Sequence, residues 1–248
     1  MADWNDPRQT QQSFGSVPRA GGDVASRTTF DAGLRKYMLS IYNYMASGIL
    51  LTGIIAMLTA SSGLAYTFAS GPLMWIVALS PLAIVFAMSF GMNKFSTGTL
   101  QMMFWGFAVL MGLSLSTIFL VYTGESIAVT FFATAGAFAG LSLFGYTTQK
   151  DLSGWGSFLI MGVIGLIIAS VINIFLQSEA LTWAVSFLGV LIFAGLTAYD
   201  TQKLKNIYSS VRGTPMMGKV VIMGALNLYL DFINMFLFLL RFMGAARE

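Results

Sequence analysis

Two acidic residues lie within long apolar stretches of the sequence, where a carboxylate is costly. Of the ten Asp and Glu residues, four fall in the N-terminal region, three in short polar connections and one at the last position, which leaves Asp200 and Asp231. A charged side chain in hydrocarbon costs roughly 2.5–3.5 kcal/mol on insertion scales, so such a residue usually faces a protein interior and serves a function. The two aspartates are therefore the first candidates for chemistry.

The neighbours of Asp231 extend it into a polar stripe. Asn227 lies four residues before it and Asn234 three residues after it, which places all three on one face of a helix. Such a stripe on an apolar helix should face the interior of a bundle. A purely structural role is also open, in which Asp231 hydrogen-bonds a neighbouring helix and Asp200 pairs with Lys203 at the membrane surface.

The two acids acquire a specific chemistry if they meet. Two carboxyl groups in contact cannot both ionise cheaply, so they share a proton and titrate as a pair, which makes a pH sensor without histidine. Deprotonated, they offer hard oxygens to Ca²⁺, whose shell Asn227, Asn234 and Thr197 could help to complete. Protonated, they bind no cation. We expect Ca²⁺ and protons as partners, a Ca²⁺ site at Asp200 and Asp231, and no cofactor.

The depths of the two acids in the membrane conflict with this contact. Counted from Lys203 and Lys219 as markers of the membrane surface, Asp200 lies only about 5 Å deep and Asp231 about 18 Å deep. The acids meet only if the last apolar helix begins in the cytosol, or if the helix that carries Asp200 continues beyond Lys205.

The composition indicates that lipid surrounds most of the chain. Hydrophobic residues make up 56% of the 248 residues and charged residues 9%, against about 25% charged in soluble domains. The absence of Cys and His excludes disulfides, thiol and imidazole catalysis and ordinary zinc sites. The basic residues form no cluster interleaved with aromatics, which argues against a nucleic-acid partner. We predict an all-α integral membrane protein.

Seven apolar segments are each close to the ~20 residues that a bilayer requires. The predicted transmembrane domain covers residues 37–244, and residues 1–36 are too polar to fold and should form a disordered cytoplasmic tail. The predicted helices cover residues 41–60, 73–92, 100–122, 127–147, 155–176, 181–202 and 220–242.

The basic residues determine the predicted orientation. Eleven of the 13 lie on the side of the N terminus, which is therefore cytoplasmic by the positive-inside rule. These are Arg8, Arg19, Arg27, Arg35, Lys36, Lys94, Lys150, Lys203, Lys205, Arg212 and Lys219. Arg241 and Arg247 lie outside. With no sign of a transit peptide or a retrieval signal, we expect a bacterial cytoplasmic (inner) membrane.

Two sequence patterns indicate how the helices are related. Residues 146–150 (Tyr-Thr-Thr-Gln-Lys) return 53 residues later as residues 199–203 (Tyr-Asp-Thr-Gln-Lys), which is consistent with a duplicated helical hairpin. Gly136 and Gly140 are four residues apart, and Gly162 and Gly165 are three residues apart. Small residues at such spacings occur where helices pack closely. We expect tight packing at these glycines.

Three stretches of the chain resemble the transmembrane Bax-inhibitor-motif family. They are Gly-Leu-Thr-Ala-Tyr-Asp-Thr-Gln over 195–202, the segment 226–242 with its Leu-Tyr-Leu-Asp-Phe-Ile-Asn run, and residues 145–153. The resemblance implies seven helices with the C-terminal helix at the centre of the bundle, and a Ca²⁺ leak controlled by pH. It also implies that Asp200 and Asp231 form the proton-sharing pair. A basic residue near the inner end of the second helix would latch the closed state, and Lys94 is the candidate here.

Two other functions fit the same acids. An intramembrane aspartyl protease also carries a pair of aspartates in neighbouring helices, but the Leu-Tyr-Leu-Asp sequence that ends at Asp231 lacks the Gly-x-Gly-Asp typical of that class. A non-conducting membrane protein that modulates other machinery would use the acids only for helix association. The sequence favours the leak channel over both, and hence a protein that is not an enzyme.

Overall fold

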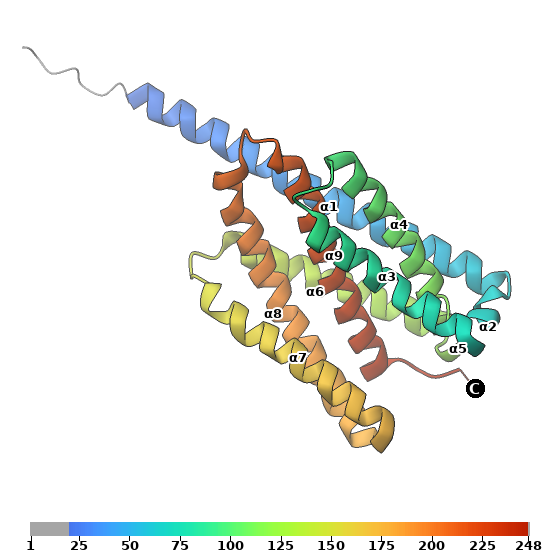
Figure 1. The fold of residues 1–248 in the computed structure, drawn as a ribbon. Coiled ribbons are helices and arrows are strands. Elements are labelled where there is room, and N and C mark those ends of the chain that lie inside the picture. The colour runs from blue at the N-terminus through green and yellow to red at the C-terminus, as the bar shows by residue number, and fades with distance from the viewer. Residues whose placement is uncertain (1–19, 248) are drawn as a thin grey trace, which may run out of the picture. The chain divides into compact units, whose positions relative to one another are not determined.

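The structure is a computed structural model that describes residues 20–247 (Figure 1). The chain divides into two units, Met1–Lys36 and Tyr37–Glu248. The described part is helical apart from short connections, with one isolated bridge between Tyr122 and Ala246. Its helices are α1 (Ala20–Ser61), α2 (Leu64–Phe68), α3 (Gly71–Gly91), α4 (Thr97–Leu115), α5 (Ile118–Val121), α6 (Gly124–Thr147), α7 (Ser153–Leu176), α8 (Glu179–Val211) and α9 (Met216–Met243).

Seven spans in the described residues are long and apolar enough to cross a membrane. They begin or end within a few residues of the predicted segments at most boundaries, because the bilayer thickness fixes the length of an apolar helix. This confirms the predicted all-α membrane fold with seven transmembrane helices. The third span is divided into α4 and α5, where the Ser116 hydroxyl donates a hydrogen bond of 2.7 Å to the carbonyl of Leu113 and competes with regular helix bonding.

The N-terminal region differs from the prediction. Residues 1–19 of the predicted disordered tail lie outside the described residues, but α1 begins at Ala20, so residues 20–36 are helical rather than disordered. Extending an existing helix adds one hydrogen bond for each residue fixed and needs no new nucleus. The polar composition of residues 20–36 therefore did not prevent helix formation.

The end of α8 and the start of α9, which the charge distribution assigns to the cytoplasm, remove the conflict in depth. The helix α8 continues to Val211 rather than ending at residue 202, and α9 begins at Met216. Counted from these ends at 1.5 Å per residue, Asp200 lies about 17 Å along α8 and Asp231 about 23 Å along α9. The two acids therefore come to similar heights in the bundle.

The helix α9 is the most buried of the seven spans. In its most apolar window 67% of the residues are buried, against 33% or less in each of the others. It packs against α8, α6 and α4 (Figure 1). The spans α3 and α7 are at the other extreme, with 11% buried, so most of their surface faces lipid.

Close helix contacts occur at only one of the four predicted glycines and also at glycines that were not predicted. A Cβ at Gly145 of α6 would overlap the carbonyl of Ala198 on α8, and one at Gly224 of α9 would lie 2.7 Å from Leu204. The predicted glycines Gly136, Gly140 and Gly165 have no such neighbour within 4 Å, whereas Gly162 packs against Ile192. The spacing of small residues does not specify which face of a helix meets another, and the prediction was wrong for three of its four glycines.

Candidate functional site

Asp231 is buried in the middle of α9. Its side chain is 5% exposed, and its Oδ2 atom has no hydrogen-bond partner among the described residues. A buried carboxyl group that lacks a donor is stable only when a proton or a nearby charge compensates it. Most of its neighbours on α9 are buried apolar residues, including Leu228 and Phe232, so the compensation has to come from another helix.

Asp200 supplies a second carboxyl group from α8. It is half-buried and lies within electrostatic range of Asp231. Lys203, one turn further along α8, acts on both acids, and its ammonium lies 5.8 Å from the centre of the Tyr199 ring. Two acids and one cation therefore lie near one another where α8 packs against α9.

Two of the three predicted supporting residues, Thr197 and Asn234, use their donors within their own helices. The buried Thr197 hydroxyl donates to the carbonyl of Phe193 at 2.8 Å, and Asn234 Nδ2 donates to the carbonyl of Leu230 at 2.8 Å. Asn227 and Asn234 are both half-buried. A hydroxyl that donates in this way keeps its lone pairs, so the oxygens of these side chains are the atoms able to meet a cation.

The acidic group is small for a resident metal. The described residues contain no cluster of three or more His, Cys, Asp or Glu side chains that could hold a metal ion. Ca²⁺ prefers six to eight oxygen ligands, so carbonyls, amides and water would have to provide most of the shell around Asp200 and Asp231.

The turn that carries the predicted latch residue, Lys94, is bound by a different lysine. Lys94 lies exposed in the turn between α3 and α4. The same turn receives Lys219 of α9, whose Nζ donates to the carbonyls of Met92 at 3.2 Å and Asn93 at 3.4 Å. The sequence did not predict these hydrogen bonds of Lys219, because every residue has a backbone carbonyl and the partners therefore leave no signal in the sequence.

A second set of hydrogen bonds joins the two copies of the repeated motif. The Gln202 side chain of α8 accepts from the amide of Leu152 and donates to the carbonyl of Lys150, both at 2.8 Å. Lys205 Nζ donates to the carbonyl of Tyr146 at 2.7 Å. The later copy therefore holds the end of the earlier one, two residues away from Asp200.

Comparison with known proteins identifies the family. The profile of the family described as "Inhibitor of apoptosis-promoting Bax1" matches residues 34–248. The chain belongs to this Bax-inhibitor family. The matched region begins four residues into the first span and includes the other six spans as well as Asp200 and Asp231, and it confirms the resemblance noted in the sequence.

Relatives that cover nearly the whole chain are bacterial. An uncharacterised protein of Caulobacter vibrioides is 48% identical over 244 residues, covering 94% of this chain and 96% of its own. The inner membrane protein YbhL of Escherichia coli K12 is 47% identical over 234 residues, covering 93% and 98%, and the protein RP147 of Rickettsia prowazekii is 47% identical over 227 residues, covering 91% and 96%. This Bax-inhibitor family member is a multi-pass protein of the bacterial inner membrane.

Proposed function

We propose that this family member is a pH-sensitive Ca²⁺ leak channel in which Asp200 and Asp231 share a proton. The observation that supports the proposal most directly is the burial of Asp231, which has an oxygen without a hydrogen-bond partner and a second acid on the adjacent helix. Neither packing nor helix capping explains this carboxyl group. Exchange of its proton for a cation gives it a function.

Protons and Ca²⁺ compete for the pair in this proposal. The carboxyl groups must release their shared proton before both can bind a cation, so Ca²⁺ binds more tightly as the pH rises. Because Asp231 is only 5% exposed, an ion reaches it only when α9 and its neighbours separate locally. The protonation state of the pair thereby couples the pH to the packing of α8 against α9.

The direct test is Ca²⁺ flux into proteoliposomes that contain only this protein, measured between about pH 5.5 and pH 8, where a coupled carboxyl pair should titrate. We expect a flux that changes severalfold across this range in the native protein. In Asp200→Asn and Asp231→Asn the flux should become independent of pH, because an amide cannot exchange a proton in this range.

Asp151→Asn is the matched control. Hydrogen bonds from Ser153 hold the pKa of Asp151 below its usual value, so this carboxylate stays ionised throughout the range and loses its charge only at a more acidic pH. Removing its charge should leave the pH profile of the flux unchanged. Zero flux at every pH would favour a non-conducting modulator, and a flux whose pH dependence survives in both Asn variants would refute the assignment to the pair.

Cleavage assays separate the channel from an enzyme. We infer that the acids serve ion permeation and not peptide hydrolysis. The reconstituted protein should therefore leave a transmembrane substrate peptide intact. Cleavage that is lost in Asp231→Asn would instead assign the pair to an aspartyl protease.

A further inference from the structure

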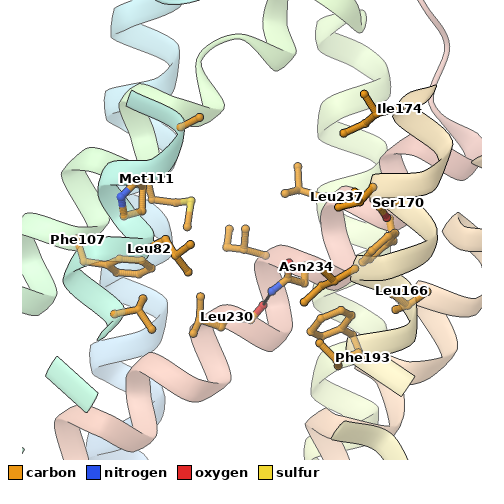
Figure 2. Close-up of a pocket in the computed structure, with 18 residues that line it drawn as sticks. Leu82, Phe107, Met111, Leu166, Ser170, Ile174, Phe193, Leu230, Asn234 and Leu237 are labelled. Carbon is orange, nitrogen blue, oxygen red and sulfur yellow. Dashed lines mark hydrogen bonds between the residues drawn. The ribbon is translucent and has the colours of Figure 1, made fainter. Parts of the chain in front are cut away.

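An apolar cavity of about 540 Å³ lies between α3 and α7, with α9 beside it (Figure 2). Its walls include Leu82 of α3, Phe107 and Met111 of α4, and Leu166 of α7. The residues that line it include 16 apolar ones, and its two polar ones are Ser170 and Asn234. Since α3 and α7 are the least buried spans, this cavity is bordered by the two helices most exposed to lipid.

A second cavity of about 460 Å³ adjoins the first one. Ser170 and Ile174 of α7 line both cavities. The rest of the second lining is mainly polar and comes from the last turn of α7, the first turns of α8 and the last turn of α9. These helix ends lie on the side that the charge distribution assigns to the outside. An apolar cavity in the membrane thus continues into a polar cavity at its outer surface.

The polar cavity contains one side chain of each charge. Arg241 and Glu179 both line it. The guanidinium of Arg241 lies 5.9 Å from the centre of the Phe238 ring, and Phe238 lines the apolar cavity. The other arginine predicted on the outer side is engaged elsewhere, since Arg247 Nη1 donates to the carbonyl of Phe119 at 3.1 Å. Helix-dipole compensation can account for an arginine in the last turn of α9, but not for the cavity beneath it.

We propose that the two cavities together bind one zwitterionic phospholipid from the outer leaflet. Its phosphate would lie at Arg241, its ammonium group at Glu179, and one acyl chain would enter the apolar cavity. Basic pockets between transmembrane helices are suited to lipid head groups, and an acidic residue beside the basic one adds complementarity to an ammonium group. The surrounding bilayer supplies a molecule with this combination of charges above a long apolar tail.

The site has a structural link to α9. The acyl chain would contact Leu230 and Asn234, which line the apolar cavity and flank Asp231 in the sequence. A bound lipid would therefore hold α9 against α3 and α7 on the side of the cavity. The inference depends on the two cavities and their charges, and it stands whether or not the protein conducts Ca²⁺.

Native mass spectrometry tests the proposal. The full chain is reconstituted in nanodiscs with equal amounts of phosphatidylethanolamine and phosphatidylglycerol, extracted into mild detergent, and examined for retained lipid. We expect one retained phosphatidylethanolamine per chain. Arg241→Gln should lower its occupancy about tenfold, because the variant loses the charge-assisted hydrogen bond to the phosphate. Glu179→Gln should abolish the preference for phosphatidylethanolamine while some lipid is still retained.

Two matched substitutions serve as controls. Arg247→Gln removes the other outer arginine and should leave lipid occupancy unchanged. Ala78→Trp places a large side chain at the apolar cavity and should displace the lipid, whereas Ala133→Trp changes an exposed alanine of α6 and should not. Three results would overturn the proposal. The protein could retain phosphatidylglycerol in preference to phosphatidylethanolamine, or Arg241→Gln and Arg247→Gln could retain equal amounts of lipid. The protein could also form a dimer that retains no lipid, which would mean that a second copy of the chain covers the cavities. The surface variants keep the test decisive if Ala78→Trp does not fold.

Discussion

At the scale of single residues, the unusual feature is a carboxyl group that packing would not select. Asp231 lies on a helix whose other buried residues are almost all apolar, and its Oδ2 atom has no donor in the described part of the chain. Replacing a buried polar group that lacks a partner by an apolar group of similar shape is usually neutral or stabilising. On this principle the group should lower the stability of the fold.

This reasoning predicts that Asp231→Leu stabilises the protein. The variant should gain about 1–3 kcal/mol, the cost of an unsatisfied buried polar group, and show a higher unfolding temperature in detergent, followed by tryptophan fluorescence. Asp200→Leu is the control, because Asp200 is only half-buried and should give a smaller change. A marked loss of stability in Asp231→Leu would instead support the structural alternative, in which Asp231 connects two helices.

At the scale of helices, α8 organises the half of the bundle that contains Asp200. It packs against α6, α7 and α9, approaches α6 most closely at Gly145, and holds the connection between α6 and α7 through Gln202 and Lys205. Most of these contacts lie within two turns of Asp200. Asp200 therefore lies on a helix that packs against three others.

The repeated motif provides a matched pair of substitutions that tests whether the hydrogen bonds of Gln202 stabilise the fold. Gln202→Leu would leave the amide of Leu152 and the carbonyl of Lys150 without their side-chain partner, at a cost of about 1–3 kcal/mol. Gln149→Leu changes the corresponding glutamine of the earlier copy, which is exposed, and should have little effect. Thermal unfolding of both variants measures the difference. Equal effects would show that the hydrogen bonds of Gln202 contribute nothing to stability.

At the scale of the whole molecule, the fold should cross the membrane seven times with its N terminus inside. The native chain contains no cysteine, so a single introduced thiol reports its own side of the membrane. Ser62→Cys, between α1 and α2, should react with an impermeant maleimide in intact spheroplasts. Ser209→Cys, near the end of α8, should react only after permeabilisation. The reverse pattern would invert the topology and place the acid pair within reach of the outside.

The sequence predicted those features that the bilayer itself determines. Apolar length gave the seven spans, and the cost of a buried charge singled out Asp200 and Asp231. Hydropathy could not predict that α8 continues to Val211, because a helix that leaves the membrane becomes polar like a loop. The partners of Lys219 and Gln202 were also missed, since both bind backbone groups, which every residue carries. Glycine spacing failed at Gly136 and Gly140 because it does not specify a helix face.

The burial of α9 has a consequence for how the protein is made. The most enclosed of the seven spans is also the last of the seven along the chain, so it is synthesised after the other six. The first six spans must therefore enter the lipid before α9 does. Until α9 is inserted, the surfaces of α4, α6 and α8 that contact it remain uncovered. Assembly is completed only when α9, which carries Asp231, has been inserted. A chain interrupted before Met216 would lack the helix whose most apolar window is 67% buried, and would leave these contact surfaces open to lipid.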